Sequence, residues 1–176
     1  MSELFSIQLQ NRQQQGRDGV WLDLPTTTEQ VQAALRQIGI SSDNPQGLFI
    51  SGYFAEEEKR IAIPYNMVLA SNVDELNFLA SRLETLSTGE RAELNAALQA
   101  PQSELSSIGK ITDFPENVDY YVHLPDVRGP AQLGDYYLNR SGMVDMPEEW
   151  KGGIDTAQFG RYVAQQEQGA FTQYGY

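Results

Sequence analysis

Cysteine is absent from this chain of 176 residues, and histidine occurs only once, as His123. The absence of cysteine excludes disulfides, cysteine-ligated zinc and thiol catalysis. A single histidine also makes a histidine-based zinc site improbable. No apolar run reaches the ~20 residues of a membrane-spanning helix, and the N-terminus has no basic, apolar leader. We therefore expect a soluble, cytoplasmic protein without metal or cofactor.

Basic residues are scarce relative to acidic ones. The chain has 12 Lys and Arg against 24 Asp and Glu, a net charge of −12. This balance argues against a nucleic-acid partner and against docking on an anionic membrane, because both depend on Lys and Arg. It permits a basic protein partner, although a solvated acidic surface is the simpler interpretation of charge alone. At 40% hydrophobic residues, the chain can bury a core.

The N-terminal part predicts a small sheet with one helix. Apolar and polar residues alternate over residues 4–10 and 20–24, which is typical of half-buried strands, and 48–55 is a third apolar run. A polar, glycine-containing segment between the first two strands predicts a hairpin loop. Between the second and third strands, a capping box of Thr26 and Glu29 predicts a helix start, and Gly39 predicts its end.

The remainder predicts helices followed by a mixed region. Two helices are expected after the cap residues Asn72 and Ser87. In the last third we predict a strand at Tyr120–Leu124, a helix capped by Asp155, and an aromatic closing strand at the end; the segment 133–150 fits either a strand or a short helix. The predicted fold class is α+β, with three small domains. Their ranges are 1–60 (α+β), 61–110 (helical) and 111–176 (α+β).

Between Asp113 and Glu149, eight acidic residues are spread along the chain instead of forming the block of like charge that is typical of a disordered acidic tail. The net charge grows from −2 over residues 1–53 to −4 over 54–103 and −6 over 104–176. B-DNA carries one negative charge per ~1.7 Å of its axis, so 12 net charges match only about 20 Å of duplex, and a dimer about 40 Å. Any imitation of DNA by this chain therefore has to be sparse and depend on shape.

Catalytic motifs are nearly missing. The pair Gly109–Lys110 lacks the first glycine and the following Ser or Thr of a phosphate-binding loop. No nucleophile elbow or calcium-loop spacing is present. A hydrolase that uses a pair of carboxylates remains an alternative, because acids are abundant and the sequence singles out no pair. We expect that this protein is not an enzyme.

The C-terminal string IDTAQFGRYVAQQEQGAFTQYGY (154–176) resembles the ending of ArdA-type antirestriction proteins. Further segments are similar to the family in the same order along the chain. They are GVWLDLP (19–25), LFISGYF (48–54), DELNFLASRLETLSTGERAELNAAL (74–98), LGDYY (133–137) and SGMVDMP (141–147). One departure is Gly52, which stands where the family usually has an acid.

The resemblance implies an elongated, acidic homodimer of three small domains that mimics B-DNA. Family members occupy the DNA-binding groove of type I restriction–modification enzymes, so the expected function is competitive inhibition of such an enzyme. The alternative is an acidic adaptor or inhibitor of another basic, DNA-binding partner. The expected partner-binding acids are Glu56, Glu57, Glu58, Asp74, Glu75, Glu84, Asp113, Glu116, Asp119, Asp126, Asp135, Asp145, Glu148 and Glu149.

The family's dimer contact lies near the stretch that matches residues 136–150. Apolar residues in that stretch are the expected dimer interface, unless they form the core of the last domain. They are Tyr137, Leu138, Met143, Val144, Met146 and Trp150. An isologous contact there would join two acidic surfaces.

Overall fold

The structure, a computed structural model, describes residues 3–14, 18–41 and 45–176. The chain forms two units with their own internal contacts. The first is Met1–Arg91 with Glu104–Val118, and the second is Ala92–Ser103 with Asp119–Tyr176. The chain passes between the units three times, within α4 (Thr88–Gln99), between Ser103 and Glu104, and within η3 (Val118–Tyr120). The division into domains 1–60, 61–110 and 111–176 stays a prediction.

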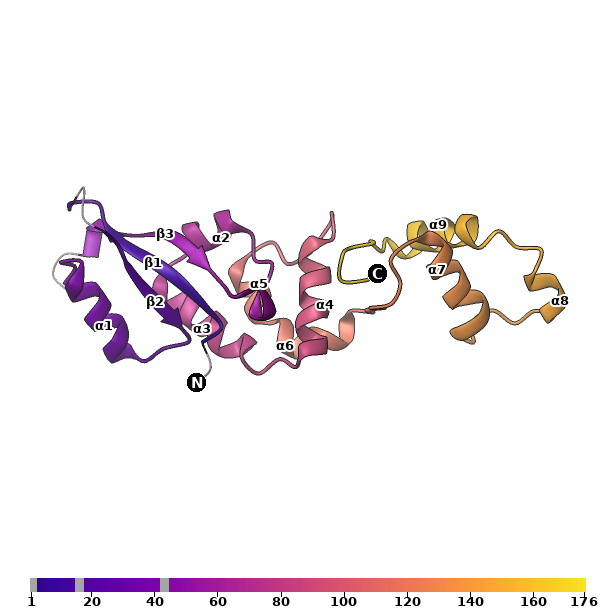
Figure 1. The fold of residues 1–176 in the computed structure, drawn as a ribbon, viewed down its shortest axis with the longest axis horizontal. Helices are drawn as coiled ribbons and strands as arrows, with labels where there is room; N and C mark the ends of the chain where they lie inside the picture. Colours follow the sequence, from indigo (N-terminus) through magenta and orange to yellow (C-terminus); the bar gives the residue numbers. More distant parts are fainter. Residues whose placement is uncertain (1–2, 15–17, 42–44) are drawn as a thin grey trace. The chain divides into compact units, whose positions relative to one another are not determined.

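The first unit contains the predicted sheet. Its strands are β1 (Phe5–Asn11), β2 (Val20–Leu24) and β3 (Leu48–Phe54), antiparallel in the order β2-β1-β3 (Figure 1). Alternation buries Phe5, Ile7 and Leu9 on one face, as predicted. The predicted hairpin loop between β1 and β2 falls in part on residues 15–17, which lie outside the described residues.

The helix after β2 begins one residue later than its capping box predicted. The helix is α1 (Thr28–Gln37), and its N-cap is Thr27 instead of Thr26. The Thr27 hydroxyl accepts from the Gln30 N–H, and the Gln30 side chain accepts from the Thr27 N–H, so the box pairs Thr27 with Gln30 and not Thr26 with Glu29. Gly39, with φ +71°, follows the helix end as predicted.

Helices complete the first unit. Besides α1 they are η1 (Pro45–Gly47), η2 (Glu57–Lys59), α2 (Tyr65–Ala70), α3 (Val73–Leu83), α5 (Ile108–Thr112) and α6 (Phe114–Asn117). The predicted caps are present, since the Asn72 side chain accepts from the Glu75 N–H at the start of α3 and Ser87 pairs with Glu90 before α4. The buried face of α3 packs against α5, which the sequence analysis did not anticipate.

The second unit is helical. It contains α7 (Pro130–Asp135), the π-helical turn η4 (Tyr136–Arg140), α8 (Glu148–Lys151) and α9 (Thr156–Glu167). Asp155 caps α9 by accepting from the Gln158 N–H, as predicted. The ambiguous segment 133–150 is therefore helical at both ends, and the chain as a whole has the predicted α+β class, with its strands confined to the N-terminal sheet among the described residues.

Two predicted strands in the second unit are wrong. Residues 111–176, all described, contain no strand and only an isolated bridge between Thr172 and Gly175. In place of the strand Tyr120–Leu124, a single backbone pairing joins Leu124 and Tyr176. Tyr120 and Val122 are 84% and 77% exposed, because no sheet within residues 111–176 covers these side chains. The C-terminal residues form a turn at Thr172–Gly175.

Two glycines bring α7 and α9 into backbone contact. A methyl group on Gly134 would lie 1.9 Å from the Thr156 carbonyl oxygen, and one on Gly160 would lie 1.8 Å from that of Pro130. Only glycine allows this close crossing, which positions Leu133 in a core with Val127 and Tyr176. In the part of the chain that the structure describes, no helix is long and apolar enough to cross a membrane.

Candidate acidic interaction surface

The predicted partner-binding acids are distributed over both units and lie mostly at the surface. The first unit carries those from Glu56 to Glu116 and the second those from Asp119 to Glu149. Among those whose exposure is described, only Glu84 and Asp135 are half-buried. The side chain of Glu58 is not among those described. On the helices, the exposed positions follow from the sequence, as in α3, where Asp74 and Glu75 lie between the buried Val73 and Leu76.

Five of these acids form ion pairs among the described residues. The pairs are Glu56–Lys59 at 3.3 Å, Glu57–Arg60 at 3.7 Å, Glu116–Arg82 at 2.6 Å, Asp135–Arg140 at 3.1 Å and Glu148–Lys151 at 2.6 Å. Exposed pairs of this kind contribute at most about 1 kcal/mol, so a partner's guanidinium can replace the internal base. They nevertheless lower the charge that these five acids present.

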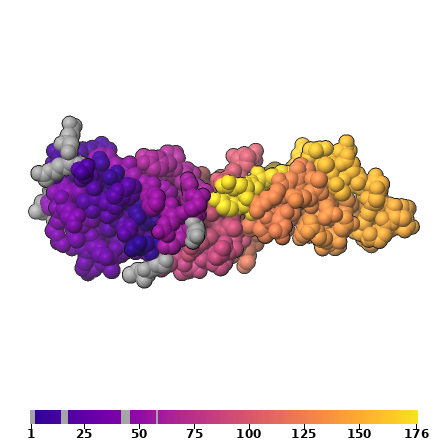
Figure 2. All heavy atoms as spheres, in the orientation of Figure 1, coloured from indigo at the N-terminus to yellow at the C-terminus, as the bar shows by residue number. Residues whose placement is uncertain are grey.

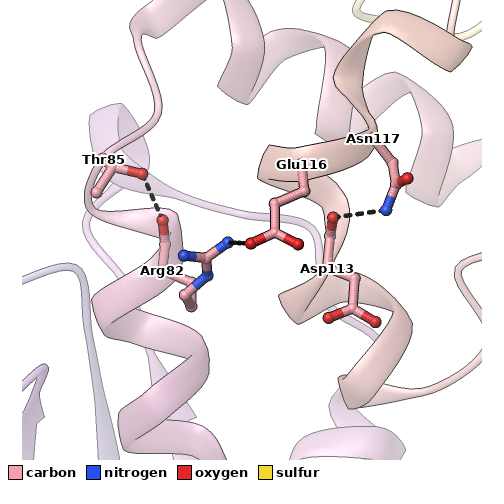
Figure 3. Close-up of polar contacts among 5 residues, drawn as sticks. All are labelled: Arg82, Thr85, Asp113, Glu116 and Asn117. Carbon is pink, nitrogen blue, oxygen red and sulfur yellow. Dashed lines mark hydrogen bonds and ion pairs between the residues drawn. The ribbon is translucent and has the colours of Figure 1, made fainter.

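One pair joins two elements of the first unit (Figure 3). Arg82 at the end of α3 reaches Glu116 in α6, and the Thr85 hydroxyl and the Asn117 amide donate to backbone carbonyls beside them. The carboxylate of Asp113 is exposed and directed away from the pair in this view. Glu116 therefore has a structural contact, whereas Asp113 is open to solvent and to a partner.

Seven predicted acids are exposed and stand outside the ion pairs described. They are Asp74, Glu75, Asp113, Asp119, Asp126, Asp145 and Glu149. Asp74 and Glu75 occupy the first turn of α3, where the helix dipole favours negative charge. A base of the partner can bind these seven acids without displacing a base from any of the ion pairs described. They are therefore the leading candidates for contact with a basic partner.

The predicted dimer residues divide into exposed and buried groups. Met143 and Trp150 are 76% and 67% exposed, whereas Val144 and Met146 are half-buried. Leu138 is only 3% exposed and belongs to the core of the second unit. Trp150 lies on α8 and Met143 on the loop before it; Figure 2 shows this C-terminal part of the chain in orange to yellow. Large apolar side chains this exposed are typical of interaction sites when they gather in a patch.

Tyr137 has a role inside the second unit. Its hydroxyl donates to Glu167 of α9, and the Tyr176 hydroxyl donates to the same carboxylate at 2.9 Å. Burial, followed by the hydrogen bond to Glu167, raises the pKa of Tyr137 to about 12. The same two causes raise the pKa of Tyr176. This arrangement ties η4 and the C-terminal turn to α9, and sequence spacing gave no sign of it.

Sequence reasoning also missed two exposed aromatic side chains on the sheet. Trp21 of β2 and Phe54 of β3 are 50% and 58% exposed. The signal was present for Trp21, because it alternates with the buried Leu22 and therefore points to the opposite face. The acids beside them, Glu3 and Asp23, were not among the expected contacts.

Two features bear on catalysis, the position of the histidine and the grouping of potential metal ligands. Nε2 of His123 lies 3.0 Å from the Tyr174 carbonyl oxygen in a partly buried position. Within residues 3–14, 18–41 and 45–176, no group of three or more His, Asp and Glu is arranged to hold a metal ion.

Comparison with known proteins gives one family. The family model described as Antirestriction protein (ArdA) matches residues 15–176. No curated protein matches the chain. The match includes the sheet strands β2 and β3 and the whole of the second unit.

Proposed function

Because the chain belongs to the ArdA antirestriction protein family, we propose that it inhibits a type I restriction–modification enzyme by occupying the groove that binds DNA. The observation that carries this proposal is the set of seven exposed carboxylates that the two units carry outside the ion pairs described. Each takes the place of a backbone phosphate for the Lys and Arg of the groove, and charge-assisted hydrogen bonds hold it there. Such an enzyme acts on DNA in the cytoplasm, so we assign the inhibitor to the same compartment.

In this proposal, net charge determines the rate of association, and the positions of the acids determine selectivity. The net charge of −12 steers the encounter, which makes association fast and sensitive to salt. Selectivity comes from the positions of the acids on folded elements, because a flexible acidic tract has no fixed spacing. The energy is spread over many contacts, so we expect each single acid-to-amide change to weaken inhibition only slightly.

The amount of charge favours a dimer. One chain matches about 20 Å of duplex and two chains match about 40 Å. Met143 and Trp150 are the most exposed apolar residues of the expected interface, and we assign them to an isologous contact, in which the same surface of each protomer meets that of its partner. Tyr137, Val144 and Met146 are half-buried and Leu138 is buried, so they contribute less to such a contact.

Dimerisation is tested by placing a charge in the expected interface. Trp150→Glu is expected to convert the dimer to a monomer, because each dimer would bury two unpaired carboxylates. Sedimentation measures the mass in solution. Phe78→Glu is the matched control, since Phe78 is 61% exposed on α3 of the first unit, and its variant should stay dimeric. A Trp150→Glu protein of unchanged mass refutes this interface.

The proposed function is tested in a type I restriction assay with unmodified target DNA. We expect cleavage to stop when the inhibitor is stoichiometric with the enzyme, and inhibition to weaken as salt rises. Normal cleavage at a large excess of the protein contradicts the proposal. Inhibition far below stoichiometry would point to a catalytic mode of action instead. Inhibition of an unrelated DNA-binding enzyme with equal potency would favour the broader alternative of a generic acidic inhibitor.

A further inference from the structure

The sheet of the first unit has a second face, opposite the one that buries Ile7 and Leu9. Ser6, Gln8 and Gln10 of β1 alternate with the buried Ile7 and Leu9 and therefore share this second face. One row across the three strands is Trp21 of β2, Gln8 of β1 and Gly52 of β3. The next row is Asp23, Ser6 and Phe54, in the same order of strands. Two neighbouring rows across the face thus carry an aromatic side chain each, Trp21 and Phe54.

The absence of a side chain at Gly52 makes room for the Trp21 ring. A methyl group on Gly52 would lie 3.0 Å from Cη2 of Trp21 and 3.1 Å from Cβ of Gln8. The indole therefore reaches across β1 to β3 and lies against the sheet, yet it is 50% exposed. A ring that is supported on one side and open on the other presents a flat, preorganised surface for stacking.

Two hollows open beside these aromatics, and the same two carboxylates line both. The first, about 210 Å³, contains Phe54 together with Glu3 and Asp23. The second, about 310 Å³, contains Trp21 with the same two acids. Glu56 and Lys59, which line the first hollow only, form an ion pair with each other. No base among the described residues forms an ion pair with Glu3 or Asp23, so both hollows keep a negative charge.

The shared chemistry of the two hollows is a carboxylate pair beside an exposed aromatic ring. A guanidinium group satisfies both at once, because it binds carboxylates through a planar fork and stacks on aromatic faces, whereas an ammonium group does only part of this. The face already holds one such contact, since the Arg12 guanidinium lies 5.2 Å from the centre of the Phe49 ring, and Phe49 pairs with Gln10.

We infer that this face, comprising Glu3, Trp21, Asp23 and Phe54, is a docking surface for arginine side chains of the basic protein partner. The inference rests on the proposed function, which supplies a partner whose groove is rich in Lys and Arg. A nucleic acid does not suit the face, because its negatively charged phosphates would be repelled by the carboxylates of Glu3 and Asp23. A second copy of the chain does not suit it either, because two faces of the same negative charge repel.

The first test uses peptides in place of the partner. A short oligo-arginine peptide is titrated into the full-length protein at fixed ionic strength, and an oligo-lysine peptide of the same length is the matched probe. Tryptophan fluorescence is expected to change and saturate, with the arginine peptide binding roughly 3-fold or more tightly than the lysine peptide. Equal affinity for the two peptides overturns the inference.

Two conservative variants locate the binding. Asp23→Asn keeps an acceptor for the Ser6 hydroxyl, which bonds the carboxylate at 2.6 Å, but removes the charge, and should weaken arginine binding roughly 3- to 10-fold. Asp18→Asn removes the same charge outside both hollows and is the control. Trp150→Phe leaves Trp21 as the one tryptophan of the chain and should keep the fluorescence response. An Asp23→Asn effect no larger than that of Asp18→Asn, or a response lost in Trp150→Phe, overturns the inference.

The second test measures inhibition of the restriction enzyme. Trp21→Ala should raise the concentration for half-inhibition roughly 2- to 30-fold, whereas Phe78→Ala, an exposed aromatic elsewhere in the unit, should not. Glu3→Gln replaces Trp21→Ala if circular dichroism shows that the latter has lost structure.

Unchanged inhibition by the folded variants overturns the assignment of this face to the partner. A fall in solution mass on Asp23→Asn would assign the face to a second copy and overturn it as well. If the wild-type protein does not inhibit at all, the proposed function fails, and the peptide titration alone decides this inference.

Discussion

The close crossing of α7 and α9 makes Gly160→Ala a severe test of how the second unit is held together. The new methyl group would lie 1.8 Å from the Pro130 carbonyl oxygen, whereas real Cβ atoms essentially never come within 3.0 Å of such an atom. Both groups belong to the backbone, so no side chain can rotate away. The two helices have to move apart by more than 1 Å, which opens the core around Leu133.

The expected cost of Gly160→Ala lies at the upper end of the range for overpacking, about 3 kcal/mol. The second unit has 70 residues, and for a domain of that size each kcal/mol shifts the melting temperature by roughly 4–8 °C. We therefore expect its melting temperature to fall by roughly 12–24 °C. Thermal unfolding followed by circular dichroism measures the shift, and hydrogen exchange shows whether α7 and α9 lose protection while the sheet keeps it.

A matched control separates this effect from the general cost of replacing glycine. Gly152 has φ −63°, and a methyl group added to it would meet nothing within 4 Å, so Gly152→Ala should change stability by no more than about 0.5 kcal/mol. If Gly160→Ala melts within a few degrees of the Gly152→Ala protein, the helices are not in the contact described, and the reasoning is refuted.

Three further perturbations test other parts of the account. Asn72→Ala removes the acceptor for the first turn of α3 and should destabilise the first unit by about 1 kcal/mol in urea unfolding; an unchanged midpoint would mean that the cap contributes nothing. Arg82→Gln releases Glu116 from its 2.6 Å pair, so inhibition of the restriction enzyme should strengthen slightly while stability falls by at most about 1 kcal/mol; weaker inhibition would contradict the view that internal pairing withholds charge. Because the pKa of Tyr137 is raised to about 12 in the folded protein, above its unfolded value of about 10, its contribution to stability is complete below pH ~10 and is lost as the pH rises toward 12. Urea midpoints measured across that range should fall more steeply for the wild type than for Tyr137→Phe, and parallel curves would exclude this role.

Local patterns in the sequence predicted the elements whose signals are local. The strands of the sheet show a period of two, and the caps at Asn72 and Asp155 bond to residues three positions later. The start of α1 was wrong by one residue, because the run Thr26–Thr28 offers several equivalent hydroxyls and the Gln30 side chain selects Thr27. The strand at Tyr120–Leu124 was wrong because a short run of aromatic and apolar residues does not reveal whether a partner strand exists.

Features that join distant residues left no local signal. Nothing in the sequence links Gly134 to Gly160, whose importance comes from a helix crossing. The same holds for the pairing of Arg82 with Glu116, whereas pairs three residues apart, such as Glu56 and Lys59, follow from helical spacing. The exposure of most acids was therefore predictable, but the share of their charge that stays available to a partner was not.

Competition with DNA for the restriction enzyme is the most direct test of the central claim that this protein acts by occupying the DNA-binding groove. The affinity of the enzyme's methyltransferase and specificity core for a labelled unmodified duplex is measured at several inhibitor concentrations and at fixed salt. The account predicts that the apparent Kd for DNA rises in proportion to the inhibitor concentration, while the amount of duplex bound at saturation stays constant. Formation of a ternary complex of enzyme, DNA and inhibitor, or an apparent Kd that reaches a plateau, would contradict it.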